Sequence, residues 1–160
     1  MKTLLYSMLL GIAALIAVPV LGQGQSTDVT NMQILRDKLK ADKKLVVAAN
    51  MQLTDAEAAK FWPIYDAYQN DLQAINLRLG NAILEYAEAY KKNTLTDDEA
   101  RKLADEALAI EDTEAKMRHT YFAKMQQAIA AKKAARYLQI ESKIRAAVRY
   151  EMAASIPLLQ

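Results

Sequence analysis

Apolar residues recur every three or four positions along most of the chain, which is the spacing of an amphipathic α-helix. Such stripes follow residues 31–49, 53–90, 95–128 and 133–154, and no stretch alternates with the period of two that a β-strand requires. The pattern predicts an all-α fold of about four helices. The longest stripe runs along residues 53–90 and consists of Phe61, Tyr65, Tyr68, Leu72, Ile75, Leu79, Ile83, Tyr86 and Tyr90.

Two helices begin with the same short motif. The residues LTDAE at 53–57 recur as LTDDE at 95–99, 42 positions later. A Thr followed three residues later by Glu forms a capping box, in which each side chain binds the backbone N–H of the other residue. We therefore expect helices to start at both motifs, with these cap residues: Leu53, Thr54, Glu57, Leu95, Thr96 and Glu99.

The predicted breaks are less uniform than the predicted starts. Residues 50–52 and 91–93 interrupt the periodicity, and a further break is needed near residues 130–133, although no Gly or Pro marks it. Pro63 lies inside the longest stripe, which continues on both sides of it. We expect this proline to kink the helix rather than end it.

The N-terminus has the pattern of an export signal. Lys2 precedes a stretch from Thr3 to Leu21 without any charge, and small residues precede a cleavage site before Gln23. This predicts a signal peptide over residues 1–22, a flexible leader over 23–30 and one helical domain over 31–160. An uncleaved membrane anchor is the alternative; after cleavage we expect a periplasmic protein without stable membrane insertion.

Charge is nearly balanced overall but segregated along the chain. The 21 basic and 19 acidic residues give a net charge of +2. Residues 94–115 hold eight acidic and two basic residues, whereas residues 131–150 hold six basic and one acidic residue. Either two neighbouring helices complement each other, or the basic helix lines a binding surface.

Residues suited to catalysis or metal binding are scarce. The chain has no Cys and one His, His119, and it lacks a Gly-rich phosphate loop and any nucleophile motif. One imidazole without thiolates is a poor zinc site. We expect no enzyme activity, no cofactor and no metal, and the mild charge and lack of a nucleic-acid-binding motif argue against a nucleic-acid partner.

Candidate binding residues are aromatic and basic. Trp62 falls one position off the main stripe and is the best single candidate for a partly exposed contact. The aromatic candidates are Phe61, Trp62, Tyr65 and Tyr68, and the basic candidates are Arg36, Lys40, Lys43, Lys44, Lys132, Lys133, Arg136, Lys143, Arg145 and Arg149. An apolar surface rimmed by cations suits loosely specific protein binding.

The paired L-T-x-x-acid helix starts in an exported, Cys-free helical chain resemble the Spy/CpxP family of periplasmic stress proteins. That family carries two LTxxQ motifs, and Glu57 and Glu99 stand here where Gln is usual. The resemblance implies an elongated kinked helical hairpin with flanking N- and C-terminal helices. It also implies a homodimer that holds unfolded clients without ATP.

Two functional hypotheses follow. The first is an ATP-independent periplasmic chaperone or envelope-stress protein that binds unfolded clients on an apolar, basic-rimmed helical surface. The second is a non-catalytic structural or sensor-inhibitory helical protein that binds one specific envelope partner. Breadth of binding distinguishes them, because a chaperone binds several unrelated unfolded proteins.

Overall fold

The computed structural model describes residues 41–159, and this part of the chain is all-α. Residues 41–51 are helical, and three long helices follow: α3 (Asp55–Lys92), α4 (Asp97–Ala128) and α5 (Ala131–Ser155). No strand occurs among the described residues, so the predicted fold class of about four helices is confirmed. The predicted signal peptide, leader and first ten residues of the domain lie outside the described residues.

The described chain divides into two compact units. The first contains residues 41–52 and 139–156, and the second contains residues 53–138 and 157–159. The division falls inside α5, which is nevertheless one uninterrupted helix.

Both predicted capping boxes are present at the starts of α3 and α4. The backbone N–H of Glu57 donates to the Thr54 hydroxyl (3.3 Å), and the Thr54 N–H donates to the Glu57 carboxylate (2.9 Å). Thr96 and Glu99 repeat this geometry at 3.3 and 2.9 Å. Each box satisfies backbone donors that the first turn of a helix leaves without an intrahelical partner.

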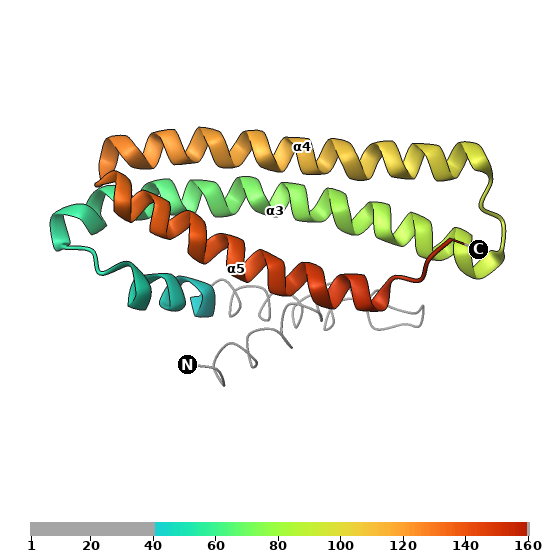
Figure 1. Cartoon of the computed structure of the whole chain (residues 1–160), viewed down its shortest axis with the longest axis horizontal. Coiled ribbons are helices and arrows are strands. Elements are labelled where there is room, and N and C mark those ends of the chain that lie inside the picture. The colour runs from blue at the N-terminus through green and yellow to red at the C-terminus, as the bar shows by residue number, and fades with distance from the viewer. Residues whose placement is uncertain (1–40, 160) are drawn as a thin grey trace, which may run out of the picture. The chain divides into compact units, whose positions relative to one another are not determined.

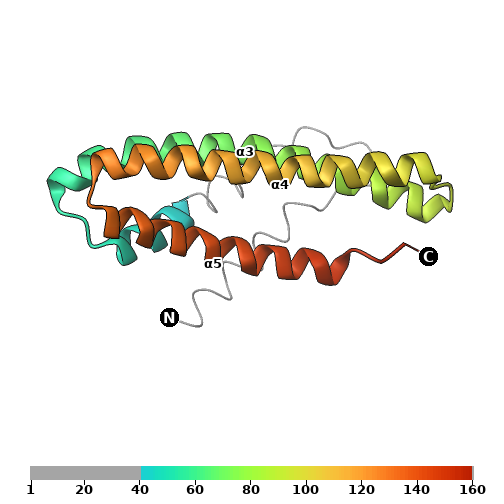
Figure 2. The same ribbon diagram turned by 45° about the horizontal axis from the view of Figure 1, so that its top comes forward.

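Helices α3 and α4 form an antiparallel hairpin. Asn93 ends α3 in the left-handed conformation (φ 50°), and its N–H donates to the Tyr90 carbonyl, while the Thr94 N–H donates to the Ala89 carbonyl (both 3.1 Å). Asn tolerates this conformation better than most residues. Figure 1 shows the two helices side by side along their lengths, and Figure 2 shows the same pair after a 45° turn.

The break between α4 and α5 is made without Gly or Pro. Ile129 is extended (φ −140°) and buried, and the Ala130 carbonyl accepts from the N–H groups of Lys133 and Ala134. The turn therefore comes at residues 129–130 and overlaps the start of the predicted break at 130–133, and α5 begins at Ala131 rather than at Lys133. Burial of the Ile129 side chain stabilises a turn for which the sequence has no conventional turn residue.

The core of the second unit is formed by the first half of the α3 stripe. Phe61, Tyr65, Tyr68, Leu72 and Ile75 are buried there. Tyr121 of α4 and Tyr137 of α5 meet the Tyr68 ring edge to face, with centroids 5.3 and 5.8 Å apart. Each fully buried aromatic side chain contributes roughly 1.5–3 kcal/mol of transfer free energy, and such edge-to-face pairs add to it.

Pro63 lies within α3, and the helix continues through it for a total of 38 residues, roughly 57 Å at 1.5 Å per residue. Proline lacks the N–H that would bind the carbonyl four residues earlier. The predicted kink stays a prediction.

Two ion pairs join α3 and α4 in the half of the hairpin nearer the turn between them. Arg78 of α3 donates hydrogen bonds from two nitrogens to the Glu106 carboxylate of α4, one of them at 2.7 Å. Lys102 of α4 lies 3.1 Å from Glu85 of α3. Glu106 belongs to the acidic stretch at residues 94–115, so part of that charge is neutralised inside the hairpin.

The described part of the first unit, residues 41–52 and 139–156, has a smaller core. Val47, Met51 and Ile144 are buried, and so is Glu141, whose carboxylate lies 2.9 Å from the ammonium of Lys43. The helical segment ends at Met51, because Gln52 takes a left-handed conformation (φ 49°). Val47 and Met51, four residues apart, occupy the buried face of this segment.

Candidate functional site

Three of the four aromatic residues predicted as client contacts are core residues. Phe61 and Tyr68 are completely buried and Tyr65 is nearly so. Both Phe61 and Tyr65 pack against the Tyr137 ring, at centroid distances of 5.2 and 5.8 Å. The prediction that these three side chains contact a client is therefore wrong for the folded chain, because α5 covers them.

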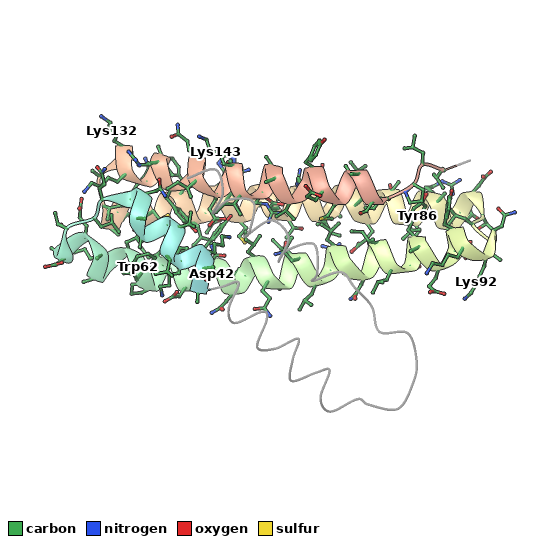
Figure 3. The ribbon with its side chains drawn as sticks, turned by 90° about the horizontal axis from the view of Figure 1, so that it is seen from below. Asp42, Trp62, Tyr86, Lys92, Lys132 and Lys143 are labelled. Atoms are coloured by element: carbon green, nitrogen blue, oxygen red, sulfur yellow. The ribbon has the colours of Figure 1, made fainter. Side chains whose placement is uncertain are left out.

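Trp62 differs from its neighbours, as its position off the stripe predicted. Its side chain is half-buried, and its ring meets Phe61 and Tyr65 edge to face at 5.1 and 5.2 Å. Figure 3 labels Trp62 on α3. It is the one predicted aromatic contact that keeps a solvent-facing part.

Lys133 forms an ion pair inside the second unit and is therefore not an exposed cation at the rim of a binding surface. Its ammonium binds the Glu57 carboxylate, which already accepts from the backbone and hydroxyl of Thr54. The hydrogen bond from Lys133, followed by those from Thr54, lowers the pKa of Glu57. The start of α5 is thus tied to the cap of α3.

Glu99 provides the comparison for this arrangement. Its pKa is also lowered, and the leading cause is the hydrogen bond from the backbone N–H of Thr96. The two caps share their geometry, but the ion pair with α5 occurs at Glu57.

Lys43 is likewise unavailable as a rim cation, which corrects that prediction. Its side chain is 13% exposed and pairs with the fully buried Glu141. Burial lowers the pKa of Lys43, and the neighbouring Arg145 acts in the same direction, whereas Glu141 raises it in part. Lys43 and Glu141 therefore join residues 41–51 to α5 inside the first unit.

The other predicted cations are divided by exposure. Lys44 and Arg145 are half-buried, whereas Arg149, Lys132, Arg136 and Lys143 are exposed. Arg36 and Lys40 lie outside the described residues.

Three of the exposed cations share one face of α5. Lys132, Arg136 and Lys143 are spaced by four and seven residues on an unbroken helix, which places them in one row. We call this row the α5 basic face, and Figure 3 shows Lys132 and Lys143 projecting from the helix. Within residues 41–159 none of these three cations forms an ion pair or donates a hydrogen bond to another side chain.

A second surface was not predicted. Leu79, Ile83, Tyr86 and Tyr90 continue the α3 stripe beyond Ile75, yet they are only half-buried. We call them the distal stripe. In the first half of α4, Leu103 and Ala100 are half-buried and Ala107 is exposed, so this half buries less apolar area than the half that carries Tyr121 and Met125.

Two buried carboxylates were also missed as structural residues. Glu141 is the single acidic residue in residues 131–150, and it lies between Tyr137 and Ile144 on the apolar side of the helix. Glu114 lies four residues after Ile110 on the buried side of α4. The sequence did contain a signal for both residues, because each carboxylate interrupts an apolar helical face. Charged residues are rarely buried on such a face without a partner.

Metal and membrane sites find no support in residues 41–159. This part of the chain has no group of three His, Cys, Asp or Glu residues placed to hold a metal ion. His119 is exposed on α4. None of the described helices combines the length and the apolar character needed to cross a membrane.

Comparison with known proteins gives no family. No family model matches the chain, and neither the curated proteins nor the solved structures give a match.

Proposed function

We propose that this chain is an ATP-independent periplasmic protein that binds unfolded clients through exposed cations on a helical surface. The observation that carries the proposal is the α5 basic face, where Lys132, Arg136 and Lys143 are exposed in one row. Flexible anionic segments of a client can meet such a row without a fixed partner geometry. The resemblance to Spy/CpxP proteins supports the periplasmic setting, the stress role and a homodimer.

The test is suppression of aggregation by the purified protein without nucleotide. Two unrelated proteins are unfolded in its presence at near-equimolar ratio, and light scattering is followed. We expect both to be protected, with partial loss of protection as salt screens the cations. The double variant Arg136→Glu and Lys143→Glu should lose most of this protection.

A charge-matched control separates the α5 basic face from net charge. Lys60 of α3 and Lys116 of α4 are exposed, so Lys60→Glu with Lys116→Glu changes the net charge equally. This control should protect both clients nearly as well as the unchanged protein. Equal loss in the two double variants would show that the row on α5 has no special role.

A second function is favoured by the burial of the aromatic candidates. Phe61, Tyr65 and Tyr68 are core residues, which leaves less exposed aromatic surface than a broad chaperone was expected to offer. This supports a structural or sensor-inhibitory protein that binds one envelope partner. Such a protein saturates its partner one-to-one and leaves the aggregation of both unrelated proteins unchanged.

A further inference from the structure

One residue of the distal stripe binds the C-terminal segment of its own chain. After α5 the chain is no longer helical, and the Pro157 carbonyl accepts a hydrogen bond from the Tyr86 hydroxyl at 2.8 Å. Tyr86 is labelled in Figure 3, and both residues belong to the second unit.

The segment Pro157–Leu159 buries little of its apolar surface at this position. Its two leucine side chains are 87% and 59% exposed, so neither is buried against α3. The four residues of the distal stripe are themselves half-buried. Both the surface and its occupant therefore keep apolar area that a better-fitting partner would cover.

We infer that the distal stripe is a binding surface for extended apolar peptides, and that residues 157–159 compete for it from within the chain. The inference rests on the proposed client-binding function and names where the apolar part of a client lies. The distal stripe supplies the apolar surface that Phe61, Tyr65 and Tyr68, as buried core residues, cannot offer to a client.

The hydrogen bond from Tyr86 to a backbone carbonyl favours an occupant of little sequence preference. A tyrosine hydroxyl that donates to a backbone carbonyl does not distinguish one side chain from another. Every extended segment presents such carbonyls. Leu79 and Ile83 then offer aliphatic contact, while the adjacent rings of Tyr86 and Tyr90, 5.8 Å apart, offer flat apolar faces with polar tips. Charged residues are absent from the four positions of the stripe itself.

The first experiment measures binding of a labelled copy of the occupant. The probe is a fluorescent peptide with the sequence of residues 155–160, SIPLLQ, and the readout is fluorescence anisotropy. The protein without residues 157–160 should bind it about fivefold more tightly than the full chain, because a tethered segment competes at an effective concentration near the millimolar range. A probe that carries Leu158→Asp and Leu159→Asp should bind neither protein.

The second experiment removes the hydroxyl and keeps the ring. In the protein without residues 157–160, Tyr86→Phe should weaken binding of the probe about fivefold, the effect of one neutral hydrogen bond. Tyr150→Phe is the matched control, since Tyr150 is 74% exposed on α5 and lies outside the stripe. Thermal unfolding followed by circular dichroism confirms that each variant is folded.

Two results would overturn the inference. One is equal affinity of the full and shortened chains for the probe, and the other is equal affinity of the Tyr86→Phe and Tyr150→Phe variants. The proposed function fails separately. If the protein bound the peptide but did not protect clients, the peptide-binding surface would stand and the chaperone function would fail. If it protected clients and neither the shortening nor Tyr86→Phe changed that protection, the chaperone function would stand and the peptide-binding surface would fail.

Discussion

Tyr121 shows how one side chain joins packing and polarity in the hairpin. Its ring packs edge to face with Tyr68, and its hydroxyl donates to the Asp71 carboxylate at 2.6 Å. The ammonium of Lys124 lies over the same ring, 4.5 Å from its centroid. Burial first, and then the hydrogen bond and charge of Asp71, raise the pKa of Tyr121 from 10.0 to about 12.

This raised pKa makes Tyr121 contribute to stability at alkaline pH. The folded chain keeps the proton that the unfolded chain loses near pH 10, so the stabilisation is present below that pH and disappears as the pH rises to about 12. Absorbance titration of the phenolates in the unchanged protein and in Tyr121→Phe should give a difference curve with its midpoint near pH 12. Asp71→Asn should shift that midpoint downward.

The Asp71→Asn variant tests the cause of this shift. If it left the midpoint of the Tyr121→Phe difference curve unchanged, the hydrogen bond and charge of Asp71 would not be raising the pKa of Tyr121.

Residue chemistry could be predicted where it acts over a few positions, and not where it depends on distant residues. Thr54 and Glu57 could be recognised as a capping box because both partners lie within one turn. The bond from Lys133 to the same carboxylate joins residues 76 positions apart, so no local pattern announced it. Phe61 and Tyr65 were misplaced for the same reason, since Tyr137, far along the chain, packs against both rings.

At the level of the element, α3 contains one residue that weakens it without visible benefit. Gly80 lies in the helix interior, and a Cβ added there meets nothing within 4 Å. Glycine in a helix loses more backbone entropy on folding than alanine does. Gly80→Ala should therefore raise the free energy of unfolding by about 0.5–1 kcal/mol.

Urea denaturation measures this change. Ala74→Gly, at an exposed position of the same helix, is the matched control and should lower the free energy of unfolding by a similar amount. A loss of stability in Gly80→Ala would mean that the site has less room than its open surroundings indicate.

The apolar stripe on α3 shows what periodicity can predict about a helix and what it cannot. Its nine positions share one helical face, and the spacing that predicted the helix is equally good in both halves. Burial nevertheless separates Phe61–Ile75 from the distal stripe, because it depends on what the opposite helix brings to each level. Periodicity can assign a face to a helix, but it cannot say how far a partner covers that face.

At the level of the whole molecule, the described parts of the two units differ in how many side chains they bury. The described part of the first unit buries Val47, Met51 and Ile144 around the pair of Lys43 with Glu141, whereas the second unit buries a long aromatic and aliphatic core. Regions with fewer buried apolar contacts open at lower free energy. We expect amides of residues 41–51 to exchange with solvent faster than those of the first half of α3.

Glu141→Gln tests whether the buried pair holds the first unit together. Removing one partner leaves the Lys43 ammonium buried without its carboxylate, which costs about 3–5 kcal/mol. Hydrogen exchange followed by mass spectrometry should then accelerate in residues 41–51 and 139–155 together, with little change in α4. Lys43→Met combined with Glu141→Leu should restore slow exchange, because an apolar pair needs no compensation for buried charge.

Glu85→Gln is the control, since its carboxylate pairs with Lys102 at a solvent-exposed position of the hairpin, where ion pairs contribute little. It should leave exchange in both units almost unchanged. If Glu141→Gln instead accelerated exchange in α4 as much as in residues 41–51, the two units would open as one. The pair of Lys43 with Glu141 would then stabilise the chain as a whole rather than one unit of it.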